Sequence, residues 1–119
     1  MSNKWHFSNN KPIYSQIVEQ VKEMIVSGVF SPGDQIGTVR EIADAASVNP
    51  NTVQRAFAEL EQTGLVHAQK TNGRFVTEDW ELIAAVRKEK TDEIVNRFLN
   101  EMKYLGYPKE QIIEILNKY

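Results

Sequence analysis

Residues 38–64 read TVREIADAASVNPNTVQRAFAELEQTG and begin with the start signal of a short helix. Thr38 and Glu41 fit a capping box, in which the threonine hydroxyl and the glutamate carboxylate each satisfy a free backbone N–H. The box predicts a helix from about residue 38 to residue 46. Its buried face is expected to consist of Val39, Ile42, Ala43 and Ala46.

A second helix is predicted directly after a tight turn at Ser47-Val48. Asn49 is a favoured N-cap residue and Pro50 fits the first helical position. Gly64 is suited to end this helix in a left-handed conformation. Two short helices joined by a turn of about three or four residues form a helix-turn-helix, so this stretch predicts that motif.

The flanking segments extend the pair to a winged helix. Apolar residues at helical spacing predict a helix from Pro12 to Ser27, and residues 29–37 are expected to form a connector. Short strands are expected over Leu65–Lys70 and Arg74–Thr77, on either side of the hairpin signal Asn72-Gly73. Three helices followed by a β-hairpin make a winged helix.

The composition changes at Asp79. Apolar residues then recur at steps of three and four up to Leu105, which predicts one long helix, weakest at 87–91 where charged residues interrupt the stripe. Gly106 and Pro108 end it and start a last helix, which reaches about residue 118. The predicted fold is therefore mainly α with a small β-hairpin.

The predicted domains are a winged helix-turn-helix over 1–78 and a helical tail over 79–119. The length of 119 residues and the 41% hydrophobic content fit one small domain with a short appendage. No apolar run reaches the ~20 residues of a membrane span. We expect a cytoplasmic protein that does not enter the membrane.

The composition gives little support to an enzyme. Cysteine is absent, which excludes disulfides and thiolate chemistry, and the two histidines, His6 and His67, are far apart in sequence. No Gly-Lys-Ser/Thr follows Gly33 and Gly37, so no phosphate-binding loop is present. We predict no catalytic residue, no metal site and no cofactor.

The second helix of the motif has an outward face suited to DNA. Residues 49–55 contain Asn, Thr, Gln and Arg and no acid, and such side chains can bond base edges or phosphates. A solvated polar face is the alternative interpretation. Basic residues before and after this helix favour DNA. The predicted DNA-binding residues are Arg40, Asn49, Asn51, Thr52, Gln54, Arg55, Lys70, Asn72, Gly73 and Arg74. Arg40 and Arg74 are expected to be exposed.

These residues lie in motifs that resemble the GntR superfamily of bacterial transcriptional regulators. The motifs are PIYSQI at 12–17, GDQI at 33–36, VREIA at 39–43, NPNTVQRA at 49–56, LEQTGLV at 60–66 and GRFV at 73–76. The two-helix tail resembles that of the YtrA-like subfamily, in which it serves dimerisation.

The resemblance implies roles for single residues. Arg40 matches the family arginine of the second helix that contacts DNA, Thr52 a polar residue of the recognition helix, and Gly73 the wing glycine. The chain departs from the family at Pro50 and Gln54, where many relatives have arginine.

The interpretation is a homodimeric transcriptional repressor that binds an inverted-repeat operator in double-stranded DNA and controls transporter or envelope-stress operons. Two alternatives stay open: a regulator with a small-molecule pocket in the tail around Trp80, Phe98 and Tyr104, and a winged-helix protein-interaction module. The sequence names no effector ligand. The predicted dimer interface consists of Trp80, Ile94, Phe98, Leu99, Met102, Leu105, Ile112, Ile113 and Leu116.

Overall fold

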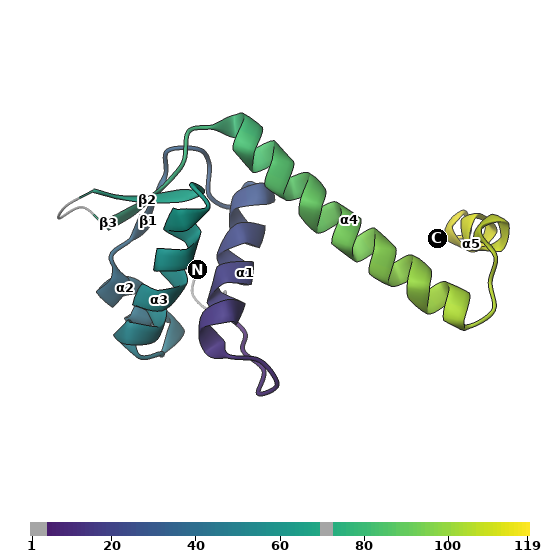
Figure 1. Ribbon diagram of the computed structural model, residues 1–119, viewed down its shortest axis with the longest axis horizontal. Helices are drawn as coiled ribbons and strands as arrows, with labels where there is room; N and C mark the ends of the chain where they lie inside the picture. Colours follow the sequence, from purple (N-terminus) through teal and green to yellow (C-terminus); the bar gives the residue numbers. More distant parts are fainter. Residues whose placement is uncertain (1–4, 70–72) are drawn as a thin grey trace. The chain divides into compact units, whose positions relative to one another are not determined.

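The computed structural model describes residues 5–69 and 73–119. In these residues five helices and three strands follow one another (Figure 1): α1 (Ile13–Val26), β1 (Gln35–Gly37), α2 (Val39–Ala46), α3 (Pro50–Gln62), β2 (Val66–Gln69), β3 (Gly73–Val76), α4 (Trp80–Tyr104) and α5 (Lys109–Leu116). The predicted mainly α fold, with a helix-turn-helix and a small antiparallel β-structure, is confirmed.

The two helices of the motif start where their capping residues predict. In α2, Thr38 Oγ1 accepts from the Glu41 N–H at 3.1 Å, and the Glu41 carboxylate accepts from the Thr38 N–H at 2.9 Å. In α3, the Asn49 side chain accepts from the Asn51 N–H at 2.7 Å. These bonds satisfy backbone donors that have no partner inside the helix, and so they fix where α2 and α3 begin.

The sheet contains a strand that the sequence pattern did not predict. Its order is β1-β3-β2, and β3 pairs antiparallel with both neighbours, so that Arg74 lies opposite Gly37 on one side and Ala68 on the other. β1 has three residues and lies within the expected connector. Three residues are too few to show an alternating pattern, and this segment becomes a strand only by pairing with β3. The Asn72 half of the predicted turn lies outside the described residues.

The core is formed by α1, α2, α3 and the sheet. The largest completely buried side chains of this part of the chain are Phe57, Ile17, Leu60 and Leu65. Of the predicted inward face of α2, Ile42, Ala43 and Ala46 are buried and Val39 is half-buried. This packing holds α3 with one face in the core and the opposite face in solvent.

The chain divides into two compact units, Met1–Val86 and Arg87–Tyr119, at a point inside α4. Leu82, Ile83 and Val86 of α4 pack against the core of the first unit. The first unit therefore extends eight residues beyond the end expected for the DNA-binding domain.

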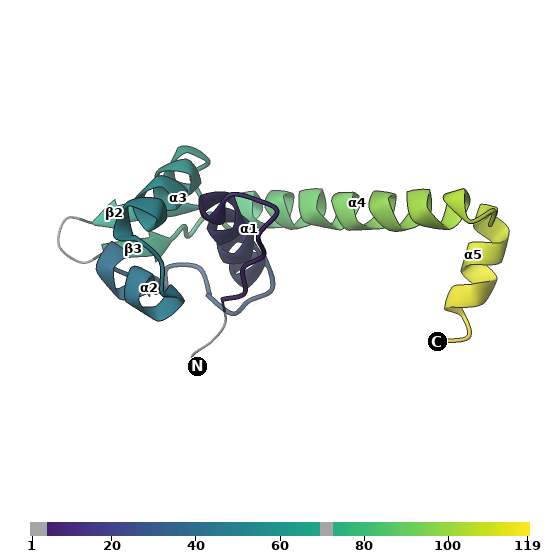
Figure 2. The ribbon, with the colours of Figure 1, turned by 90° about the horizontal axis from the view of Figure 1, so that it is seen from below.

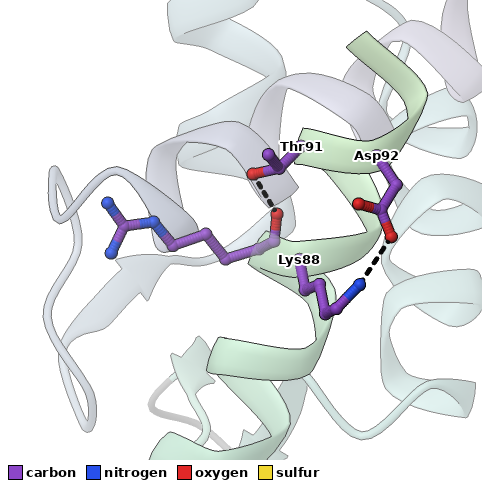
Figure 3. Close-up of polar contacts among 4 residues, drawn as sticks. Lys88, Thr91 and Asp92 are labelled. Atoms are coloured by element: carbon purple, nitrogen blue, oxygen red, sulfur yellow. Dashed lines mark hydrogen bonds and ion pairs between the residues drawn. The ribbon is translucent and has the colours of Figure 1, made fainter. Parts of the chain in front are cut away.

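The charged interruption at 87–91 does not break α4, which Figure 2 shows as one continuous helix. Figure 3 shows the contacts within this segment: Lys88 Nζ lies 2.8 Å from Asp92 Oδ2, and the Thr91 hydroxyl donates to the Arg87 carbonyl at 2.9 Å. The hydrogen bond and charge of Asp92 raise the pKa of Lys88. Pairs four residues apart support an exposed helix only weakly.

Among the described residues, no helix combines the length and the apolar character that crossing a membrane requires.

Candidate nucleic-acid interface

The exposed face of α3 carries the predicted base-reading residues. Asn51, Gln54 and Arg55 are exposed, and Thr52 is half-buried, while Val53, Ala56, Phe57 and Leu60 point into the core. The first turn of α3 contains no acidic residue. Pro50 has no N–H and the Asn51 N–H is engaged by Asn49, so this turn offers an anion the partial positive charge of the helix end, with no carboxylate on the same turn.

A contact with α1 fixes Arg55. Its guanidinium carbon lies 3.8 Å from the centroid of the Tyr14 ring, a cation–π arrangement. Stacking engages the flat face of the guanidinium and leaves its edge to carry the N–H donors. Tyr14 thus orients a predicted DNA-binding arginine. This pair could not be predicted from residue spacing, because its members belong to different helices.

Asn49, one of the predicted DNA-binding residues, has the N-cap role that the sequence predicts. Its side-chain oxygen caps α3 through the Asn51 N–H. The residue is exposed, at the start of the helix that carries the polar face. Asn49 therefore sets the entry geometry of α3, on which the placement of Asn51 and Gln54 depends.

Arg40 is exposed, as expected, in the first turn of α2. An arginine in this turn faces the positive end of the helix dipole, which is unfavourable unless an anion is near. The neighbouring Glu41 carboxylate is engaged by the Thr38 N–H. Arg40 is thus a solvent-facing positive charge on the first helix of the helix-turn-helix.

The expectation that Arg74 is exposed is wrong. Its side chain is 14% exposed, and its Nε lies 2.6 Å from Oε2 of Glu61, whose side chain is 33% exposed. Pairing in the sheet brings β3 against the end of α3, and the arginine is covered there. An arginine held by a carboxylate is not a free surface charge. Glu61 was not identified from the sequence, since nothing in its spacing links it to Arg74.

The wing glycine, Gly73, lies against the backbone of β1. Gly73 is buried and has φ +87°, and a Cβ at this position would lie 2.7 Å from the carbonyl oxygen of Gly37. Its lack of a side chain lets β3 approach β1. Lys70 and Asn72, also predicted to contact DNA, lie outside the described residues.

His67, which we do not predict to be catalytic, is exposed on β2. Its ring stacks on that of Phe75, with the ring centroids 6.0 Å apart. Within the ranges 5–69 and 73–119 no group of three or more His, Asp or Glu side chains is arranged to hold a metal ion. His67 is a strand residue with an aromatic cross-strand neighbour.

The predicted interface residues divide by exposure. Ile112 is 1% exposed in the single chain, so its assignment to a dimer surface is wrong: it packs inside its own protomer. Leu99 and Met102 are half-buried. The exposed members are Trp80, Ile94, Phe98, Leu105, Ile113 and Leu116. Trp80 belongs to the first unit and the other exposed members to the second.

Comparison with known proteins identifies the family to which this chain belongs. The family model described as "Bacterial regulatory proteins, gntR family" matches residues 13–76, the whole of the helix-turn-helix and its sheet. The chain belongs to the GntR family. GntR proteins are DNA-binding transcription regulators of the helix-turn-helix (HTH) type, and α3 is the second helix of that motif in this chain.

Individual relatives extend the match into the tail. The uncharacterized HTH-type transcriptional regulator YhcF of Bacillus subtilis is 38% identical over 108 residues, 91% of this chain and 89% of YhcF. A GntR family transcriptional regulator from Listeria monocytogenes is 39% identical, with a TM-score of 0.89 over 95% of this chain and 99% of that one.

The HTH-type transcriptional repressor YtrA of Bacillus subtilis is 39% identical over 71 residues, 60% of this chain and 55% of YtrA. This GntR protein is therefore YtrA-like, as the resemblance implied.

Proposed function

We propose that this GntR protein is a homodimeric repressor that binds an inverted-repeat operator through α3. The observation that carries the proposal is the exposed face of α3, where Asn51, Gln54 and Arg55 face solvent and the first turn has no acid. Amides and arginine are the side chains that bond base edges in the major groove. Its similarity to a protein named as a repressor supports the direction of regulation.

The exposed apolar side chains of the second unit support the dimer. Ile94, Phe98, Leu105, Ile113 and Leu116 lie on α4, α5 and the start of their connection, and all are exposed in the single chain. Apolar surface of this kind is typical of an interaction site. A two-fold pair also presents two recognition helices, which matches the symmetry of an inverted repeat.

The operons proposed as targets encode transporters or respond to cell-envelope stress, as for the YtrA-like subfamily that the tail resembles. The rival idea of a tail pocket around Trp80, Phe98 and Tyr104 gains no support from the burial pattern. Tyr104 is 91% exposed, and Trp80 belongs to the other unit. We therefore give the tail the role of pairing two copies.

Selection from a randomised DNA library tests operator reading. The full chain should enrich two half-sites in inverted orientation, and Gln54→Ala should relax the preference at one position of each half-site, at a cost of roughly 1–3 kcal/mol there. Gln62→Ala, at the other end of α3, is the matched control and should leave the consensus unchanged. Enrichment of a single, asymmetric half-site contradicts the dimer, and an unaltered consensus for Gln54→Ala removes this residue from base reading.

Arg40→Ala should weaken binding to operator and unrelated DNA alike. A phosphate contact releases about one counterion, so the slope of log affinity against log salt should fall by about one charge. Fluorescence anisotropy over a salt series measures the slope, with Lys11→Ala as a control that removes an exposed positive charge at another place in the same unit. An unchanged slope for Arg40→Ala would exclude the contact.

A further inference from the structure

Glu61 and Arg74 form an ion pair between the end of α3 and the strand that leads away from the hairpin tip. Glu61 is the penultimate residue of α3, and Arg74 is the second residue of β3. The Nε and Oε2 atoms are 2.6 Å apart, and the two side chains are 14% and 33% exposed. The pair thus joins the element that presents amides and arginine to the element that forms the wing.

The two charges depend on each other. The Glu61 Oε2 and Arg74 Nε atoms are both buried, and neither makes a hydrogen bond of acceptable angle within the described residues. Their 2.6 Å separation is therefore an ion pair without hydrogen-bond geometry. Losing one partner of such a pair leaves the other as an uncompensated charge in a poorly solvated place, and the local structure must move to solvate it.

Movement at Arg74 is transmitted to the rest of the wing. β3 is the central strand of the sheet, and Arg74 lies opposite Gly37 of β1 and Ala68 of β2. Its neighbour Gly73 is the first residue of β3, where an added Cβ would lie 2.7 Å from the Gly37 carbonyl oxygen. A shift of Arg74 away from α3 consequently reorients the hairpin relative to the recognition face.

We infer that Glu61 and Arg74 are positioning residues that set the wing against α3, and that Arg74 binds Glu61 instead of a DNA phosphate. This inference rests on the proposed use of α3 and the wing on DNA. It gives Arg74 of the GRFV motif a structural role, and it makes Glu61, an acidic residue, strengthen the binding of DNA.

The DNA experiment compares Glu61→Gln, Arg74→Gln and the double variant with Glu59→Gln, which removes the same charge from an exposed position of α3. We expect each single variant to weaken binding about tenfold and the double variant to be no weaker than the poorer single, since both remove one interaction. The two single variants should change the salt slope alike, because both act through the wing and Arg74 makes no phosphate contact of its own.

The opposite pattern overturns the inference. If Arg74 contacts a phosphate, Arg74→Gln lowers the salt slope by about one charge, and Glu61→Gln binds as well as Glu59→Gln or more tightly, because the arginine is released toward the DNA. Wild-type protein that binds no DNA would instead contradict the proposed function, and the two failures are therefore distinguishable.

A second measurement uses the free protein. Hydrogen exchange of the β3 amides, for example the Val76 N–H that bonds the Asp34 carbonyl at 2.8 Å, reports how firmly the wing is held. Glu61→Gln should speed this exchange severalfold and Glu59→Gln should not. Equal exchange rates in the two variants would show that the pair does not hold the wing, whatever happens on DNA.

Discussion

Cutting the chain after Val86 is expected to leave a folded monomer whose operator affinity is lower by about two orders of magnitude or more. The cut keeps Leu82, Ile83 and Val86, which pack against the core of the first unit, and removes the unit with the exposed apolar side chains. In the proposed dimer, binding of one recognition helix holds the second at a high effective concentration near its half-site. The monomer lacks this advantage. Affinity for unrelated DNA should fall much less.

Sedimentation velocity and anisotropy on the same samples measure both effects. The matched control is a cut after Val76, which also removes Leu82, Ile83 and Val86 and should therefore destabilise the first unit. A full chain that sediments as a monomer at micromolar concentration, and still binds an inverted repeat tightly, would contradict the proposed dimer. So would a 1–86 fragment that keeps the full affinity.

Gly73→Ala is expected to destabilise the first unit by about 2–4 kcal/mol. The methyl group would lie 2.7 Å from the Gly37 carbonyl oxygen and 2.9 Å from its carbon, and both are backbone atoms that cannot turn away. The left-handed φ of +87° adds a cost of roughly 1–2 kcal/mol for any residue with a Cβ. Either β3 separates from β1 or the whole edge of the sheet shifts.

Urea unfolding followed by tryptophan fluorescence isolates this effect, since Trp5 and Trp80 both belong to the first unit. Gly28→Ala is the matched control: its φ is +90°, but nothing lies within 4 Å of the added methyl group. It should show only the conformational cost of roughly 1–2 kcal/mol. An equal loss of unfolding free energy in the two variants would mean that the backbone of Gly37 can move away from the added methyl group. Glycine would then be needed at position 73 only for its positive φ.

The helix-turn-helix and the sheet show which parts of the fold can be predicted from local sequence. Both helices of the motif could be predicted, because the capping pair Thr38 and Glu41 and the cap Asn49 act within one turn of the chain. β1 could not, since residues 35–37 become a strand only by pairing with β3. The exposure of Arg74 was mispredicted for the same reason: its partner is Glu61, and only the tertiary fold brings them together.

The candidate site follows the same division. The outward direction of Asn51 and Gln54 follows from the inward apolar positions of α3, so the helical period was enough to place them. The contact of Arg55 with Tyr14 requires α1 to lie beside α3 and has no counterpart in the spacing of either residue. Ile112 shares the apolar character of its neighbours, and only the folded second unit shows that it is buried.

None of the 25 residues of α4 is buried in the single chain. Most helices in proteins owe their stability to packing, so the part of α4 beyond Val86 would gain much of its stability in the proposed dimer. Assembly of the proposed dimer then obeys mass action: while monomers predominate, doubling the number of molecules in a cell raises the number of dimers about fourfold. Repression by such a protein responds steeply to its own rate of synthesis, and the dissociation constant from sedimentation sets the copy number at which the response begins.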